Sequence, residues 1–271
     1  MSSIIQRLTC AALLWSSTYA FNIPQLFDVP WTKKNVNVPQ GNQNLEKAIL
    51  AAISDNGSGK RLDNSQNIVS LVKELERIEK TNPSGILSPA ISDQVLGRWK
   101  LIHTTNADTA SPIQRKAVDS TSFNIYQDIL LTTVNDTDTT TSERLIVSQV
   151  VQFTPSIFLR VDALASTSRY PLPELTERKG DGKLLGLNIL GVSLVGDEAQ
   201  EDADRPDSRI YFVFDEGYFS VNGFRIPYPV PFRSPFFRDA VKGWIDITYL
   251  SPRMRVSRGN KGTTFVLIRE A

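Results

Sequence analysis

Residues 243–270 read GWIDITYLSPRMRVSRGNKGTTFVLIRE and are rich in Ile, Val, Tyr and Phe. Segments 250–253 and 259–262 interrupt this run with Pro, Ser, Asn and Gly, residues that allow the chain to reverse. Runs of β-branched and aromatic residues separated by such turns are typical of antiparallel hairpins. This part of the chain therefore predicts three antiparallel strands joined by two tight turns.

Similar short runs precede it from about residue 92 onward. Together they predict strands at 97–104, 121–134, 143–154, 158–164, 187–195, 209–214, 218–221, 243–250, 254–257 and 263–269. No long helix interrupts them, which favours an antiparallel barrel or sandwich. Upstream, two segments show apolar residues at helical spacing: Leu45, Ile49, Ala52 and Ile53, then Ile68, Leu71, Val72, Leu75 and Ile78. We therefore expect a mainly β fold preceded by a short helical hairpin.

With 271 residues, of which 41% are hydrophobic, the chain is long enough for one large domain with a core. Its 30 basic and 29 acidic residues nearly cancel. Nucleic-acid binding needs a basic surface that displaces counterions, so this balance argues against it. A protein with so little net charge recognises its partner through shape and apolar contact.

The N-terminal residues 1–20 have the features of a secretory signal peptide. Arg7 precedes the apolar run 8–15, and Thr-Tyr-Ala at 18–20 forms a small-residue cleavage site. The run is shorter than the roughly 20 residues that span a membrane. We expect this segment to be removed together with Cys10, the only cysteine of the chain. An uncleaved anchor and a buried segment are the alternatives.

Residues 21–41 begin with Phe-Asn-Ile-Pro and contain Lys33 and Lys34 against one acidic residue, Asp28. A signal peptide followed by a transit peptide that starts with Phe resembles the bipartite leader of algae with secondary plastids. The resemblance implies delivery to the plastid. Ordinary secretion is the alternative.

Side-chain direction alternates along a strand, so the hairpins of 243–270 assign residues to faces. With a turn at 250–253, we predict three cross-strand pairs: Asp246 with Arg255, Trp244 with Ser257, and Ser257 with Thr264. The opposite face collects Ile245, Ile247, Tyr249, Met254, Val256, Phe265 and Leu267. Two interpretations follow. Either the apolar face is the core and the ion pair is exposed, or the ion pair points into the barrel and the apolar face packs under the helices.

The C-terminal part closely resembles the signature of the plastid lipid-associated proteins, or fibrillins. The residues that carry this resemblance are Asp246, Tyr249, Leu250, Arg255, Ser257, Arg258, Gly259 and the run Phe265-Val266-Leu267. A Gly97-x-Trp99 motif shortly after a helix pair is also how the fibrillin domain begins. The resemblance implies a lipocalin-like antiparallel β-barrel over residues 92–271, which forms one fibrillin domain (42–271) with the helical region 42–91. Residues 165–210 show no diagnostic motif.

Such a resemblance also implies a function: binding or organising apolar or amphipathic lipids, such as a carotenoid, a quinone or another isoprenoid. The lipid would lie in the barrel or at a plastid lipid surface, namely a plastoglobule or the thylakoid, and the protein could also be stromal. The candidate ligand-binding residues are Trp99, Trp244, Asp246, Arg255 and Ser257. Two alternatives remain: a xanthophyll-modifying enzyme of lipocalin type, and a structural partner of a prenylquinone-synthesis enzyme that holds no ligand.

The sequence gives little support for catalysis. His103, the only histidine, lies in a predicted strand with no second histidine or mature cysteine to form a dyad or a metal cluster. There is no Gly-x-Ser-x-Gly motif and no glycine-rich phosphate loop. The acidic run 197–204 lacks the spacing of an EF-hand and indicates a solvated loop. We expect no enzymatic activity, no cofactor and no metal site.

Residues 223–238 combine aromatic residues, arginines and prolines. The aromatic residues are Phe224, Tyr228, Phe232, Phe236 and Phe237, and the arginines are Arg225, Arg233 and Arg238. The prolines exclude a central strand and keep the segment extended, so its rings cannot all enter one core. The segment either contacts a lipid surface, with arginines at anionic headgroups, or covers the end of the barrel.

Overall fold

The computed structural model describes residues 38–56, 60–81, 83, 86–105, 122–137, 140–173, 175, 203, 205–238, 241–260 and 262–270. The leader, with Cys10, and the strand predicted at 187–195 lie outside the described residues. So does the acidic run, apart from Ala203. The domain boundaries after residues 20, 41 and 91 stay predictions.

Two helices come first, α1 (Gln40–Asp55) and α2 (Gln66–Thr81). Each buries one apolar stripe, which contains Ile49 in α1 and Ile68, Val72 and Leu75 in α2. Two short 3-10 helices, η2 (Pro89–Ile91) and η3 (Asp93–Val95), lead into the first strand. In the described part of the chain, no helix has both the length and the apolar character needed to cross a membrane.

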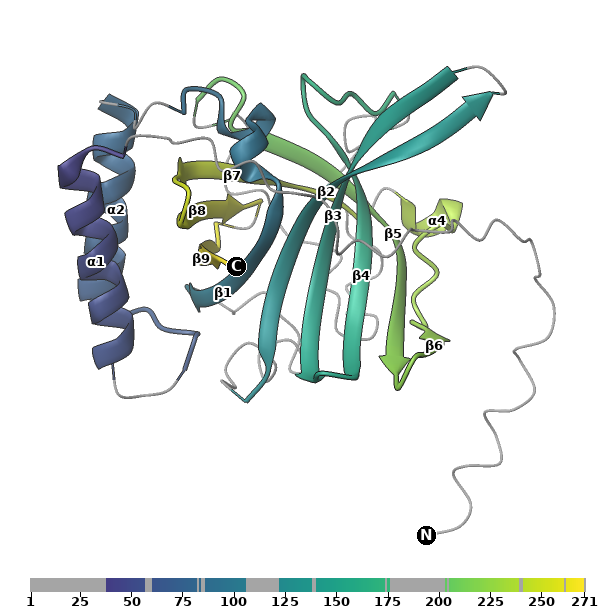
Figure 1. The fold of residues 1–271 in the computed structure, drawn as a ribbon, viewed down its shortest axis with the longest axis horizontal. Coiled ribbons are helices and arrows are strands. Elements are labelled where there is room, and N and C mark those ends of the chain that lie inside the picture. Colours follow the sequence, from purple (N-terminus) through teal and green to yellow (C-terminus); the bar gives the residue numbers. More distant parts are fainter. Residues whose placement is uncertain are drawn as a thin grey trace, which may run out of the picture. The chain divides into compact units, whose positions relative to one another are not determined.

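The strands are β1 (Gly97–Thr104), β2 (Asn124–Thr137), β3 (Thr140–Thr154), β4 (Ile157–Ser166), β5 (Arg209–Val221), β6 (Phe224–Pro227), β7 (Lys242–Leu250), β8 (Met254–Gly259) and β9 (Thr264–Arg269). They form one sheet in the order β4-β3-β2-β1-β9-β8-β7-β5-β6 (Figure 1). An additional antiparallel pairing of β4 with β5 closes the sheet into a ring. The expected fold, a helical hairpin followed by a closed antiparallel β-sheet, is confirmed.

Two features of the strands differ from the prediction. The runs predicted at 209–214 and 218–221 form the single strand β5, because Asp215 is accommodated as the extra residue of a bulge opposite β4. The short strand β6 lies within the proline-rich segment and pairs with the second half of β5. Its position at the end of the strand order agrees with the rule that proline is confined to edge strands.

The interior of the barrel holds the main core. Inward-facing residues include Trp99 and Leu101 of β1 and Ile125 and Ile129 of β2, all buried in one cluster. The Trp99 ring N–H donates to the carbonyl oxygen of Val95 at 2.8 Å and so fixes η3 against this end of the barrel. The chain enters β1 through Gly97 at φ 128°, a conformation that requires glycine.

A second core lies between the helices and the outer face of the sheet. It joins the apolar stripes of α1 and α2 to Tyr249, Met254, Val256 and Val266. Figure 1 shows both helices standing beside β7, β8 and β9. The helical hairpin therefore covers the outside of the C-terminal strands.

The cross-strand pairs predicted for the C-terminal hairpins are wrong. Asp246 lies opposite Arg258, Ile247 opposite Ser257, and Ser257 opposite Phe265. In the β7–β8 hairpin, the cause is a register shift between Ile247 and Tyr249, together with a wider turn that begins after the pair Leu250 and Arg255. In the β8–β9 hairpin, the pairing differs from the prediction by one residue.

The shift also divides the residues that were predicted to share one apolar face. Ile245, Ile247 and Leu267 enter the barrel core, and Phe265 packs against it. Tyr249, Met254 and Val256 face the helices instead. Part of one interpretation is therefore correct, because apolar residues of these strands do pack under the helices.

Candidate functional site

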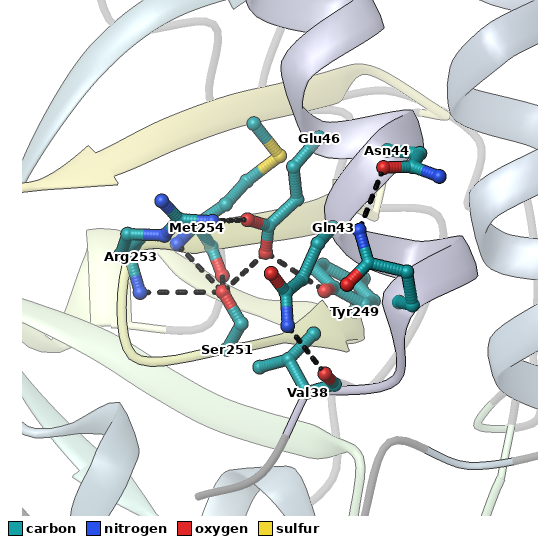
Figure 2. A network of polar contacts seen from close by, with 9 residues as sticks. Val38, Gln43, Asn44, Glu46, Tyr249, Ser251, Arg253 and Met254 are labelled. Atoms are coloured by element: carbon teal, nitrogen blue, oxygen red, sulfur yellow. Dashed lines mark hydrogen bonds and ion pairs between the residues drawn. The ribbon is translucent and has the colours of Figure 1, made fainter.

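Helix α1 is fastened to the β7–β8 turn by one buried carboxylate (Figure 2). Glu46 Oε1 accepts hydrogen bonds from the hydroxyl groups of Tyr249 at 2.8 Å and Ser251 at 2.6 Å. Glu46 Oε2 accepts from Arg253 Nη2 at 2.9 Å. Burial and the neighbouring Glu46 charge raise the pKa of Tyr249, so its phenol remains a neutral donor. Because both oxygens are satisfied, this network holds the helix in place.

Two carboxylates of α2 also bind residues of the barrel or of the segment before β5. Glu76 accepts from Thr248 Oγ1 at 2.7 Å and from Arg258 Nε at 2.9 Å. Glu79 is fully buried, and its Oε1 accepts from Arg205 Nη1 at 3.2 Å. The charges between the helices and the barrel are therefore compensated.

Asp246 lies on this outer face, because it is the cross-strand neighbour of Arg258. Its two oxygens accept from Nε and Nη2 of Arg209 at 2.7 and 2.8 Å, and both side chains are almost fully buried. The Arg209 guanidinium also stacks on Trp244, 3.7 Å from the ring centroid. The predicted contact between Asp246 and Arg255 is therefore wrong.

Arg255 lies inside the barrel, and most of its donors have no partner in the part of the chain that the structure describes. The side chain is fully buried, and its Nη2 donates to Gln127 Oε1 of β2. The guanidinium carbon lies 5.1 Å from the Trp99 ring centroid. Arg255 Nε and Nη1 have no hydrogen-bond partner among the described residues. The buried hydroxyl of Ser257, two residues along the same face of β8, also has none there.

A second arginine, Arg269, shares the Trp99 ring with Arg255 and acts on it with a charge of the same sign. Arg269 lies 4.2 Å from the Trp99 ring centroid and donates to the backbone carbonyls of Pro252 and Leu96 at 2.9 and 2.8 Å. Burial, and to a lesser extent the charge of Arg269, lowers the pKa of Arg255 to about 9, so the guanidinium is still charged at neutral pH. No Asp or Glu in the described part of the chain pairs with it. A buried charge without a counter-charge is costly.

The structure brings together three of the five predicted ligand residues. Trp99, Arg255 and Ser257 face the barrel interior, whereas Trp244 and Asp246 belong to the outer cluster around Arg209. Their role in ligand binding stays a prediction. We call Trp99, Gln127, Arg255 and Ser257 the polar site.

Sequence reasoning missed two residues in or beside the polar site. Gln127 stands between the inward-facing Ile125 and Ile129, and a polar residue inside an alternating apolar series is the signal that points to it. Arg269 follows the inward-facing Leu267 by two residues at the end of β9. Its position on that face could have been inferred from the alternation alone.

The only histidine of the chain lies away from the polar site. His103 is opposite Val266, which belongs to the core under the helices, and burial lowers its pKa. In the part of the chain that the structure describes, no cluster of His, Cys, Asp and Glu is suited to hold a metal ion.

The aromatic segment 223–238 is divided between surface and core. Phe224 and Ile226 of β6 are 78% and 54% exposed. Phe232 is only 2% exposed and stacks on Tyr228, with ring centroids 6.1 Å apart. Burial removes Phe232 from the predicted lipid surface and agrees with the alternative, a cover packed on the barrel. The side chains of Phe236 and Phe237 lie outside the described structure.

The arginines of this segment contact the barrel itself. Arg233 pairs with Asp215, Nη2 to Oδ2 at 2.6 Å, and Arg238 donates to a backbone carbonyl of β5. Arg225 lies over the Tyr218 ring, 4.5 Å from its centroid. Among the described side chains of the predicted lipid-surface segment, the large apolar ones that are exposed are thus Phe224 and Ile226 of β6.

Comparison with known proteins agrees with this geometry. The family model PAP_fibrillin matches residues 43–169 and 208–268, which overlap both helices and every strand described above. The chain is also similar to the probable plastid-lipid-associated protein 12, chloroplastic, of Arabidopsis thaliana, with 38% identity over 231 residues. That alignment covers 83% of this chain but only 44% of the relative, so the chain spans less than half of its relative's length. No solved structure matches the chain. These matches confirm the expected plastid location, and the chain belongs to the PAP_fibrillin family of plastid lipid-associated proteins.

Proposed function

We propose that this protein binds an amphipathic lipid inside its barrel and holds it at a plastid lipid surface without catalysing a reaction. One observation carries the proposal: buried polar atoms of Arg255 and Ser257 have no partner among the described residues, yet they adjoin an apolar core. A lipid with a polar end satisfies these atoms, because its head accepts hydrogen bonds while its tail contacts apolar side chains.

The polar site lies toward a closed end of the barrel. Trp99 is bonded to Val95, and Arg269 is bonded to Leu96, so η3 and the residue after it are tied to the polar site. From Arg255, the core continues through Leu267, its cross-strand neighbour, and Leu101, which is opposite Leu267. The lipid head therefore lies at the closed end and the tail along this apolar wall.

The β5–β6 hairpin supplies a surface contact. Its turn residues Asn222 and Gly223 have φ of 51° and 88°, which produces a tight reversal that presents Phe224 and Ile226 to the outside. Aromatic and aliphatic side chains at such a tip suit the interfacial layer of a membrane or lipid droplet. This supports adhesion to a plastoglobule or thylakoid surface.

A binding role is also better supported than a catalytic one. The only histidine of the chain, His103, faces the helix-side core and not the polar site. The xanthophyll-modifying alternative therefore gains no observation in its favour. The other alternative, a structural partner of a prenylquinone-synthesis enzyme, requires an empty barrel and is an outcome of the following test.

The test is to purify the full chain from a plastid-containing host, extract it with organic solvent and identify the extract by mass spectrometry. A matched variant with Phe224→Ser and Ile226→Ser distinguishes barrel from surface, because these side chains lie outside the barrel. We expect one lipid class at close to one molecule per chain in both proteins. Empty extracts, or a lipid that disappears in the variant, would contradict an internal ligand.

A further inference from the structure

We propose that the head of the lipid in the barrel is an anion, a carboxylate or a phosphate monoester, that accepts hydrogen bonds from Arg255. This inference rests on the proposed function and narrows it, because carotenoids and quinones are neutral. It follows from the arrangement of charges in the described structure.

Each buried carboxylate of the described residues is paired with an arginine. These ion pairs include Glu46 with Arg253, Glu76 with Arg258, Glu79 with Arg205 and Asp246 with Arg209. The converse does not hold in the interior, since Arg255 and Arg269 both carry positive charge and neither pairs with an Asp or Glu of the described residues. Of the two, Arg269 is bonded to several backbone carbonyls, so the missing negative charge belongs beside Arg255.

The hydrogen-bond donors of the polar site also favour an anionic head. Nε and Nη1 carry three of the five N–H donors of a guanidinium, and in Arg255 both atoms lack partners in the described part of the protein. Ser257 adds a hydroxyl, whereas Gln127 Oε1 is already engaged by Arg255 Nη2. A ligand here must supply several acceptors. Carboxylates and phosphates do so with a charge that also neutralises Arg255.

Water molecules in the barrel could satisfy the same N–H groups but could not neutralise the charge. A site for an anionic lipid and a site for water differ in one measurable respect. An anionic lipid should bind more tightly than an ester of the same chain length, whereas a site built only for water shows no such preference.

The experiment uses the delipidated full chain and three probes with the same alkyl chain: dodecanoate, dodecyl phosphate and methyl dodecanoate. Binding is measured by calorimetry and by tryptophan emission, to which Trp99 of the polar site contributes. We expect one molecule of either anion per chain and an affinity at least about tenfold higher than for the ester, since hydrogen bonds to charged groups are the strong ones. The ratio between the two anions then identifies the head group.

Three variants connect this preference to the polar site. Arg255→Met keeps a long apolar side chain without charge, so we expect the anion preference to disappear and the thermal midpoint of the free protein to rise. Ser257→Ala should weaken anion binding several-fold with the fold intact. The matched control, Arg77→Met, removes a guanidinium from the exposed face of α2, where Arg77 pairs with Glu74, and should change neither property.

Several results would overturn the inference. Equal affinity of the unaltered chain for dodecanoate and its methyl ester rejects the anionic head but leaves lipid binding in place. An anion preference that survives in both Arg255→Met and Ser257→Ala locates the anion elsewhere. If no probe binds, the proposed function fails together with the inference. Should Arg255→Met not fold, Ser257→Ala and Arg255→Lys still decide the question, because the lysine variant should retain part of the preference.

Discussion

At the scale of single residues, the family signature in the last strands contains two kinds of polar side chain. Tyr249 and Arg258 contact Glu46 and Glu76 and so hold the helices against the barrel. Arg255 contacts no carboxylate of the described residues, although it lies on the strand that carries Arg258. Packing within the chain explains Tyr249 and Arg258 but does not explain Arg255.

The helix contact can be tested at Glu46. We expect Glu46→Gln to lower the free energy of unfolding by about 1–3 kcal/mol, because the amide cannot act as acceptor on both atoms and leaves the Arg253 charge unpaired. Urea denaturation measures this change. The control is Glu74→Gln on α2, whose ion pair with Arg77 is exposed, and it should leave the midpoint unchanged. Equal effects of the two substitutions would show that the buried network adds nothing.

His103 makes stability depend on pH. Burial holds its pKa below the ordinary value, while Asp63 acts weakly in the opposite direction. The folded state therefore favours neutral imidazole, so this stabilisation is complete above about pH 6.5 and is lost as the pH falls. Between pH 7.5 and 5.5, we expect the unaltered protein to lose stability faster than His103→Gln, by at most about 1.4 kcal/mol per pH unit. Parallel urea midpoints in the two proteins would contradict this.

At the scale of elements, the positions of helices and strands could be predicted because their apolar spacing is local. The register between the strands could not be predicted from the sequence. Ile-Asp-Ile-Thr-Tyr at 245–249 alternates like a regular strand, yet the register shifts between Ile247 and Tyr249. No glycine marks the irregularity, so alternation placed Asp246 opposite Arg255 when its partner is Arg209 on a strand distant in sequence.

The candidate site, too, could be predicted only in part from the sequence. Alternation put Arg255 and Ser257 on one face, and one of the two interpretations turned that face into the barrel, where both side chains lie together with the motif residue Trp99. Glu46 and Glu79 were not foreseen as buried, because a glutamate on an amphipathic helix normally faces solvent. Their burial depends on donors brought by residues more than a hundred positions away, which local patterns do not contain.

The β5–β6 hairpin yields a prediction about lipid adhesion. We expect Phe224→Ser with Ile226→Ser to reduce flotation with vesicles of plastid lipid composition, while the thermal midpoint hardly changes because both side chains are exposed. Leu87→Ser is the control, since Leu87 is a 69% exposed apolar residue away from the hairpin. Flotation that persists in the double variant would show that adhesion involves another surface.

Phe232, in the same segment, should contribute to stability, unlike Phe224 and Ile226. It is buried against Tyr228 and Phe214, with ring centroids 6.1 and 5.7 Å away, so Phe232→Ala leaves a cavity. We expect a loss of about 3–5 kcal/mol in the free energy of unfolding. Thermal and urea unfolding measure it. A nearly unchanged midpoint would mean that this ring does not belong to the core.

At the scale of the whole molecule, ligand affinity should depend on pH through Arg255. Burial lowers its pKa to about 9, and the charged group that faces it is Arg269. Because the anion binds the protonated guanidinium, we expect affinity for dodecanoate to be constant from pH 7 to about 8 and to fall up to about tenfold per pH unit above pH 9. Binding of methyl dodecanoate serves as the control and should stay flat. An equally flat profile for dodecanoate would contradict a role for this charge.

The pairing of β1 with β9 has a consequence for the order in which the protein can form. Strand β1 finds one of its two neighbours only in the last strand, Thr264–Arg269, and α1 and α2 are packed on β7, β8 and β9. A chain that emerges from the ribosome, or crosses a membrane with its N-terminus first, thus presents both helices and β1 long before their partners arrive. Contacts so distant in sequence form slowly. The barrel therefore cannot close before β9 is available, however early the helices and β1 are made.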